Sequence, residues 1–407
     1  MPPNPSNVHL LYAARCLRGF GDGFAVIVLP AYLSAIGLGP IEIGLVATAS
    51  LLGTAVFTLL IGLIAPRHDL RNMVLLGTAL MVLTGVAFPR FEHVALIAGV
   101  AFIGTINPST GDIGVLVPLE HALLARSIAD EDRTRAFARY SLIGALSMAA
   151  GALAAGATDI LVARGFTDLA AFKLMFYLYA ALGLMAAAVY RRLPRSPAEP
   201  SRAVAPLGPS RHVVYKLAAL FSLDAFAGGF IVQSLLVLWL FERFELSLAA
   251  ASLFFFWSGV LSAFSYPVAA WIAGRIGLIN TMVFTHIPSS ICLIAAAFSS
   301  DLTVALGLLL VRSALSQMDV PTRTSYVMAV VTPAERTAAA SVTAVPRSLA
   351  SSISPAFSGM LLTLPFAGLP LVLCGSLKII YDLALLYSFR HIRPPEEQGA
   401  IRAMRGR

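Results

Sequence analysis

Apolar residues occur along the chain in twelve long runs, separated by short stretches rich in Gly, Pro and charged residues. The runs lie at residues 9–36, 41–65, 72–88, 94–125, 135–163, 168–190, 213–241, 247–273, 278–299, 302–331, 337–364 and 367–389. Their lengths are near the roughly 20 residues that an α-helix needs to cross the hydrocarbon core of a bilayer. The pattern therefore predicts an all-α membrane protein with twelve transmembrane helices.

Composition supports this prediction and narrows the classes of function. Hydrophobic residues make up 58% of the 407 residues and charged residues only 12%, whereas about a quarter of an average soluble domain is charged. The three cysteines lie inside apolar runs without paired spacing, which indicates packing rather than a disulfide framework or a thiolate metal site. The sequence carries no phosphate-binding loop, zinc-ligand spacing, nucleophile elbow or nucleic-acid motif. We therefore expect no enzyme activity, no cofactor, no metal and no nucleic-acid partner.

The arginines between the runs predict the orientation of the chain. Seventeen of them lie in the even-numbered connections, the central linker and the C-terminal tail, against three, Arg90, Arg164 and Arg243, in the odd-numbered loops. Short loops rich in Lys and Arg stay on the cytoplasmic side. We therefore expect a multi-pass protein of the cell membrane, which is the inner membrane in a bacterium, with both termini in the cytoplasm.

Two stretches begin and end alike at the same relative position in the two halves of the chain. They are VPLEHALLARSIADEDRT at 117–134 and VPTRTSYVMAVVTPAERT at 320–337. Their offset of 203 residues carries the chain through six crossings, and an even number preserves direction, so the halves form a parallel repeat. The sequence predicts a six-helix bundle at 1–190, a cytoplasmic linker at 191–212, a second bundle at 213–390 and a cytoplasmic tail at 391–407.

These features, with the Pro- and Arg-rich linker RRLPRSPAEPSRAVAPLGPSRH, make the chain resemble the major facilitator superfamily of secondary transporters over nearly its whole length. That family carries G-x-x-x-D-R-x-G-R-K between spans 2 and 3. The corresponding loop here, GLIAPRHDLRN, keeps Gly62, Arg67 and Arg71 but has Pro66 in place of the Asp. The resemblance implies two pseudo-symmetric six-helix bundles, a central cavity lined by spans 1, 4, 7 and 10, and alternating access.

A second motif of the family bears on the direction of transport. Its exporters often carry G-P-x-x-G-G in span 5, and this chain has GALAAG there, with Gly151 and Gly156 but Ala152 in place of the Pro. Small residues also let helix backbones approach closely. The motif therefore fits helix packing as well as export.

Ionisable side chains inside the runs are the best functional signal, because placing one near the bilayer centre costs about 2.5 to 3.5 kcal/mol on insertion scales. Arg15, Arg18 and Asp22 follow one another at spacings of three and four in span 1, which places them on one helix face. All four spans that the resemblance assigns to the cavity contain such polar groups. The candidate substrate or cavity residues are Arg18, Asp22, Asn107, Asp112, Asp224, Gln233, Arg312 and Asp319.

Three of these carboxylates, Asp22, Asp112 and Asp319, are candidate proton carriers. Burial favours the neutral form of a carboxyl group, and a nearby Arg favours the charged form. As an alternative, Asp22 pairs with Arg18 one turn away. Asp112 follows NPSTG at 107–111, a combination that predicts a break in the helix near the membrane centre.

Glu120 and Arg323 occupy corresponding positions in the two halves, one to two turns from the cytoplasmic face. Opposite charges at equivalent positions are candidates for a cytoplasmic gate that closes as a salt bridge in one state and opens in the other. As an alternative, each pairs locally, Glu120 with His121 or Arg126 and Arg323 with Asp319.

Further polar residues in the spans are interpreted as serving helix packing. Arg347 and Asp382 belong to this group, and Asp382 is able to meet Lys378 one turn before it. His121 is identified as the only histidine well within a span beside a carboxylate, where it either packs or helps to carry a proton.

Because no nucleotide-hydrolysing motif is present, we expect a monomeric secondary transporter that moves a small solute across the bilayer by alternating access, coupled to protons and in the export direction. A second hypothesis is an organic-anion importer or exchanger in which Arg18, Arg312 and Arg323 hold the anion. A third is a membrane receptor or assembly factor that does not transport and reuses the same scaffold.

Overall fold

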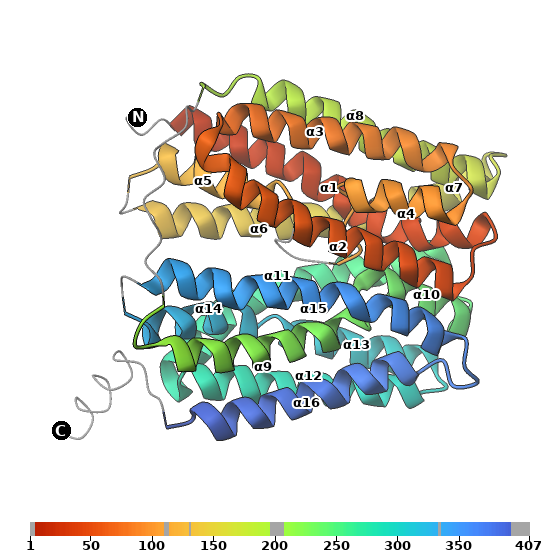
Figure 1. Cartoon of the computed structure of the whole chain (residues 1–407). Coiled ribbons are helices and arrows are strands. Elements are labelled where there is room, and N and C mark those ends of the chain that lie inside the picture. Colours follow the sequence, from red (N-terminus) through yellow and green to blue (C-terminus); the bar gives the residue numbers. More distant parts are fainter. Residues whose placement is uncertain (1–4, 110–113, 130–131, 196–206, 333–334, 392–407) are drawn as a thin grey trace. The chain divides into compact units, whose positions relative to one another are not determined.

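The computed structural model describes residues 5–109, 114–129, 132–195, 207–332 and 335–391. In these residues all regular structure is helical (Figure 1). The first half contains α1 (Pro5–Ala35), α2 (Pro40–Ile64), α3 (Leu70–Ala87), α4 (Val94–Ile103), α5 (Val117–Ser127), α6 (Arg133–Ala154), α7 (Ala157–Ala163) and α8 (Asp168–Tyr190). The second half contains α9 (Arg211–Gly229), α10 (Gln233–Phe244), α11 (Leu248–Ile276), α12 (Leu278–Phe298), α13 (Leu302–Ser316), α14 (Asp319–Val330), α15 (Arg336–Leu362) and α16 (Leu369–Phe389).

Each predicted apolar run corresponds to one helix or to two consecutive helices. The runs that contain two are those of α4 with α5, α6 with α7, α9 with α10, and α13 with α14. Ten helical stretches of the described chain are long and apolar enough to cross a membrane. The two remaining runs are 94–125, which the structure interrupts, and α15, which is rich in Ser and Thr. The predicted all-helical membrane fold is confirmed.

The helix break predicted in span 4 is also confirmed, since α4 ends at Ile103, α5 begins at Val117, and the described residues 104–109 and 114–116 are not helical. Polar contacts within the break replace some of the lost helical hydrogen bonds. The side-chain oxygen of Asn107 accepts a hydrogen bond from the backbone N–H of Ser109 (2.9 Å). The carbonyl of Pro108 accepts one from the N–H of Ser234 at the start of α10 (3.1 Å). Non-helical backbone at membrane depth requires such partners.

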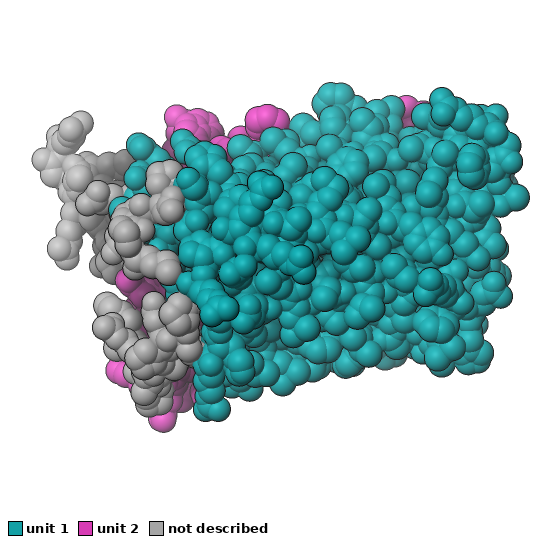
Figure 2. All heavy atoms as spheres, turned by 90° about the horizontal axis from the view of Figure 1, so that it is seen from above, with its two compact units in different colours: residues 1–201, 231–260, 355–367 teal, residues 202–230, 261–354, 368–407 magenta. Residues whose placement is uncertain are grey.

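The chain forms two compact units, coloured separately in Figure 2. Unit 1 comprises residues 1–201, 231–260 and 355–367, and unit 2 comprises residues 202–230, 261–354 and 368–407. Each unit is therefore built from more than one stretch of sequence. The division into bundles at 1–190 and 213–390 stays a prediction.

Close helix packing in unit 1 depends on glycine. In this unit α1 packs against α6 and α8 (Figure 1). A Cβ atom on Gly23 would lie 2.0 Å from the carbonyl oxygen of Met148, and one on Gly151 would lie 2.0 Å from that of Phe20. Such close backbone contact between helices requires residues without a side chain. Gly151 of the exporter-like motif therefore has a packing role.

The core of unit 2 brings four helices together. Here α12 packs against α13 and α16, and α16 packs against α9. Buried side chains from α9, α12, α14 and α16 form one cluster that includes Phe221, Met282, Tyr326 and Tyr381. This core holds the polar side chains of the same four helices close to one another.

A carboxylate in the loop between α14 and α15 fixes the start of α9. Glu335 accepts hydrogen bonds from the hydroxyls of Thr332 (2.6 Å) and Ser210 (2.8 Å). It also accepts them from the backbone N–H groups of Gly208 (2.5 Å) and Ser210 (3.3 Å). These donors, the Thr332 hydroxyl foremost, lower the pKa of Glu335 to about 2. The negative charge thus lies at the N-terminal end of α9, where the helix dipole favours it.

Candidate functional site

Several ionisable side chains inside the spans form one cluster in each unit. The unit 1 cluster consists of Arg18, Glu120, Tyr140 and Tyr190. The unit 2 network consists of Asp224, His286, Asp319, Arg323, Lys378 and Asp382. Both contain residues that the sequence predicts for a cavity or a gate, and both contain partners that it does not predict.

Glu120 is the centre of the unit 1 cluster and is 0% exposed. Its carboxylate accepts hydrogen bonds from the guanidinium of Arg18 on α1 and from the hydroxyls of Tyr140 on α6 and Tyr190 on α8. A buried carboxylate is tolerated where a cation and further donors satisfy its oxygens. Glu120 thereby ties α5 to three other helices of unit 1.

These partners of Glu120 differ from the local pairing considered from the sequence. The neighbouring His121 packs edge-on against the rings of Phe137 and Tyr140, each at a centroid distance of 5.0 Å. Sequence proximity favoured His121, but α1 packs against α5 and brings Arg18 to the carboxylate from 102 residues away. The gate predicted for Glu120 and Arg323 is not tested by these contacts and stays a prediction.

Asp22 lies one turn beyond Arg18 on α1 and accepts a hydrogen bond from the hydroxyl of Tyr179 on α8 (3.1 Å). The same hydroxyl lies 3.0 Å from that of Thr105. Arg18 pairs with Glu120, and among the described residues it forms no ion pair with Asp22. Asp22 is therefore a partly buried carboxylate whose hydrogen-bond donor is a neutral hydroxyl, while Arg18 and Arg15 act on it electrostatically without pairing with it.

Asp224 on α9 is the centre of the unit 2 network and is 4% exposed. One carboxylate oxygen lies 3.0 Å from Nη1 of Arg323 on α14, and the other lies 2.6 Å from Nζ of Lys378 on α16. Arg323 also lies 3.2 Å from a carboxylate oxygen of Asp319, four residues before it. The local pairing considered for Arg323 and Asp319 is thus present, with Asp224 as a second partner.

His286 extends the network from α12. Its Nδ1 lies 3.1 Å from Oδ1 of Asp382, and its Nε2 lies 3.3 Å from Nζ of Lys378 and 3.9 Å from Oδ1 of Asp224. An ammonium group has only donors, so Nε2 accepts from Lys378 and Nδ1 carries the proton that it donates to Asp382. The second carboxylate oxygen of Asp382 is buried and has no hydrogen-bond partner among the described residues. The arrangement indicates a neutral imidazole between a carboxyl group and a cation.

Two interpretations of the sequence are corrected here. His121 is not the only histidine beside a carboxylate, because His286 in the run 278–299 lies against Asp382. Asp382 does not pair with Lys378 one turn before it, because Lys378 turns toward Asp224 on another helix. The sequence signal for His286 was its position within an apolar run; its partner lies 96 residues away in the chain and became visible only in the fold.

The ion pairs of the two units join corresponding spans and have opposite polarity. The offset of 203 residues places Glu120 at the position of Arg323. In unit 1 the cation lies on α1 and the anion on α5, at Arg18 and Glu120. In unit 2 the anion lies on α9 and the cation on α14, at Asp224 and Arg323. The first and fourth spans of each half are therefore joined by a buried ion pair, with the charges exchanged.

The other predicted site residues lie outside these ion pairs. Asn107 is buried in the break between α4 and α5. The buried side-chain oxygen of Gln233, at the start of α10, has no hydrogen-bond partner among the described residues. Arg312 on α13 forms no ion pair with any of them, and Asp112 lies outside them. No group of three or more His, Cys, Asp or Glu side chains in the described chain could hold a metal ion.

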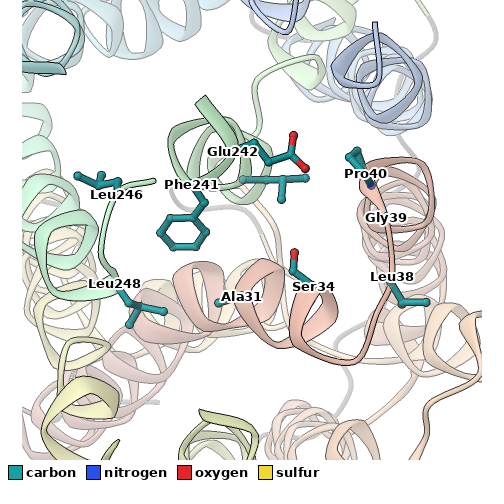
Figure 3. A pocket seen from close by; sticks show the side chains of 10 residues that line it. Ala31, Ser34, Leu38, Gly39, Pro40, Phe241, Glu242, Leu246 and Leu248 are labelled. Carbon is teal, nitrogen blue, oxygen red and sulfur yellow. The ribbon is translucent and has the colours of Figure 1, made fainter. Parts of the chain in front are cut away.

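Unit 1 also contains an open pocket of about 480 Å³, shown in Figure 3. It is lined by Ala31, Ser34, Leu38, Gly39, Pro40, Leu238, Phe241, Glu242, Leu246 and Leu248. Glu242 and Ser34 supply polar groups among mainly apolar side chains (Figure 3). None of the site residues predicted from the sequence lines this pocket.

A helical chain of twelve apolar spans, with charged side chains buried in the spans of both units, has the features of a membrane transporter. Over residues 11–355 the sequence matches the Major Facilitator Superfamily, and the chain belongs to this family. It is accordingly a secondary transporter of small solutes and not an enzyme. It is 26% identical over 421 residues to the uncharacterized membrane protein YJR124C of Saccharomyces cerevisiae, with 94% of each chain covered.

Two solved structures are similar to this one. The nucleoside transporter NupG is 14% identical with a TM-score of 0.73, covering 95% of this chain and 99% of its own. The xylose transporter XylE from E. coli, in an inward open conformation, is 14% identical with a TM-score of 0.74, covering 97% and 99%. At this level of identity the similarity concerns the fold.

Proposed function

We propose that the protein is a proton-coupled secondary transporter that moves a small solute by alternating access, and that the unit 2 network couples the proton to the solute. The observation that carries this proposal is the position of His286 between Asp382 and Lys378. Imidazole changes its charge between pH 5 and 8 unless its surroundings shift it. A histidine inside a span, bonded to both a carboxyl group and an ammonium group, is therefore suited to take up and release protons.

Protonation of His286 changes the partners of the network. The proton adds to Nε2 and removes the acceptor that faces Lys378. The imidazolium then repels the neighbouring ammonium group. Lys378 therefore moves away from His286, or Asp224 exchanges Lys378 for the imidazolium, whose Nε2 lies 3.9 Å from Oδ1 of Asp224. The groups that face His286 are Asp382, Lys378 and Tyr381 on α16 and Asp224 on α9. Because Asp224 joins α9 to α14 and α16, its change of partners alters the pairing of these helices.

The carriers proposed from the sequence have different places in this scheme. Asp22 is retained as a second proton site, because its hydrogen-bond donor is the neutral Tyr179 rather than a cation. Asp319 is the less suitable carrier, since Arg323 already neutralises it. Asp112 stays a candidate that lies outside the described residues.

The proposal also covers the direction of transport and the membrane in which the protein lies. Export is favoured by the exporter-like spacing of Gly151 and Gly156, although Gly151 also serves packing. Uptake of an organic anion together with a proton is the second candidate, favoured by the guanidinium of Arg347 in unit 2, which has no ion-pair partner among the described residues. We place the protein in the cell membrane with both termini in the cytoplasm, as the distribution of arginines predicts.

Proton coupling is tested with the full chain in proteoliposomes that contain pyranine as an internal pH indicator. Uridine, xylose and benzoate serve as probes, the first two because NupG and XylE are nucleoside and xylose transporters. We expect at least one probe to move protons and to accumulate when a pH gradient is imposed. His286→Gln should abolish accumulation but retain exchange of labelled for unlabelled probe.

The matched control is His212→Gln, which changes an exposed histidine at the start of α9. It should behave as the wild type. Undiminished accumulation in His286→Gln would show that the proton is carried elsewhere, and Asp22→Asn would then be the next variant.

A further inference from the structure

Arg347 is an unpaired cation deep in the membrane. It lies on α15 eleven residues after Arg336, the first residue of the helix, which corresponds to about 17 Å along the axis. Its guanidinium forms no hydrogen bond and no ion pair with any residue that the structure describes, and its Nε is buried without a partner. Charged groups at this depth normally face a partner or a cavity.

The surroundings of Arg347 explain why no protein carboxylate neutralises it. Asp224 and Asp319 act on it electrostatically, and so does the like-charged Arg323. Both carboxylates are already bound, because Arg323 lies 3.0 Å from Asp224 and 3.2 Å from Asp319. Asp224 additionally holds Lys378 at 2.6 Å. The two carboxylates that act on Arg347 are therefore already paired with other cations.

A second guanidinium of unit 2 also lacks a carboxylate partner. Arg312, on α13, has no hydrogen-bond or ion-pair partner for its side chain in the described chain. The ionisable neighbour that acts on it is the Cys374 thiol on α16. The spans of unit 2 thus contain two arginines without carboxylate partners, which gives this part of the membrane a positive potential.

We propose that the transported solute carries a carboxylate or phosphate group and that the guanidinium of Arg347 binds this group beside the unit 2 network. The planar guanidinium fork matches both anions and forms two parallel hydrogen bonds with either. The inference rests on the proposed transport function and adds the chemical class of the solute. It also changes the role of Arg347, which the sequence suggested was helix packing.

The thermal stability of the ligand-free protein distinguishes the two roles of Arg347, helix packing and solute binding. If Arg347 stabilised the fold through a buried pair, Arg347→Gln would lower the thermal unfolding temperature strongly. If its partner is the solute, removing an unpaired charge leaves the unfolding temperature of the ligand-free protein unchanged or raises it. A marked decrease in Arg347→Gln would overturn the proposal, since it would reveal a partner within the protein.

Binding is tested on the purified full chain in detergent by thermal unfolding with four probes of similar size. Benzoate and phenyl phosphate are anions, benzamide is neutral and benzylamine is a cation. We expect both anions to raise the unfolding temperature of the wild type, and Arg347→Gln to require at least a tenfold higher concentration for the same shift. Arg275→Gln is the matched control, because Arg275 stacks on the Trp271 ring (3.8 Å) away from the network.

Three results would contradict the proposal: no shift with either anion, an equal shift with benzylamine, or an unchanged response in Arg347→Gln. An anionic lipid headgroup presents the same chemistry, so phosphatidylglycerol is added in a separate arm. If that lipid alone produces the shift and benzoate does not, the group bound by Arg347 is a headgroup and not the solute. This assay needs no gradient, so anion binding without proton movement would reject proton coupling and leave the anion site standing.

Discussion

The guanidinium of Arg18 donates a hydrogen bond to the carboxylate of Glu120, and both side chains are buried in unit 1. Unit 2 contains the related pair of Asp224 and Arg323, with the charges exchanged between the first and fourth spans. At the position that the repeat relates, the fourth span carries Glu120 in unit 1 and Arg323 in unit 2, so the corresponding spans of the two units have opposite charges there.

Breaking the unit 1 pair on one side should destabilise the protein strongly. Arg18→Met leaves the fully buried Glu120 without its cation, and such a loss typically costs about 3 to 5 kcal/mol. The double variant Arg18→Met, Glu120→Leu should recover most of this loss, because no buried charge remains. Thermal unfolding of the two single variants and the double variant measures the coupling. If the losses of the single variants add in the double variant, the two side chains do not stabilise each other.

The packing role of Gly151 predicts that even Ala is harmful there. A Cβ atom at this position would lie 2.0 Å from the backbone oxygen of Phe20, which cannot move as a flexible side chain does. Overpacking of this kind typically costs about 1 to 3 kcal/mol. Gly274→Ala is the control, since a Cβ there meets nothing within 4 Å. Equal unfolding temperatures for the two variants would mean that α1 and α6 are not in close contact at Gly151.

The local features of this fold were predictable from the sequence, because they depend on local composition. Apolar runs marked the spans, and NPSTG at 107–111 marked the break before α5. Partners across helices were not predictable in the same way. The alternative considered for Glu120 paired it with His121 or Arg126 in its own helix, yet it pairs with Arg18 on α1. Side chains at spacings of three and four share a face, but that rule does not identify the helix against which the face packs.

The network of unit 2 shows the same limit. Asp224, Asp319 and Arg323 were identified because charges are conspicuous in apolar runs. His286 and Lys378 were missed as a pair because they lie 92 residues apart. Arg347 was assigned to packing because the sequence could not show that nearby carboxylates were already bound.

Glu335 should contribute stability that depends on pH. Its pKa is lowered from 4.5 to about 2 in the folded protein, so its stabilising effect is present above pH 4.5 and is lost as the pH falls toward 2. Glu335→Gln should therefore lower the unfolding temperature at pH 6, and the difference from the wild type should shrink between pH 4.5 and 2. Glu92→Gln, at an exposed position, is the control. A difference that is constant over this range would show that the charge of Glu335 does not hold the start of α9.

The pH dependence of anion binding decides between the two candidate modes of coupling. Protonation of His286 adds positive charge to the network beside Arg347, so benzoate, which stays ionised above pH 6, should bind more tightly at pH 6 than at pH 8. Coupling free energies of this kind typically change affinity by about fivefold or more. His286→Gln should remove the difference, and His212→Gln should keep it. Tighter binding at low pH, the expected result, means that the proton and the anion bind together, as co-transport requires, and it favours the second candidate, uptake, over export. Weaker binding at low pH means that they compete, as export by proton exchange requires.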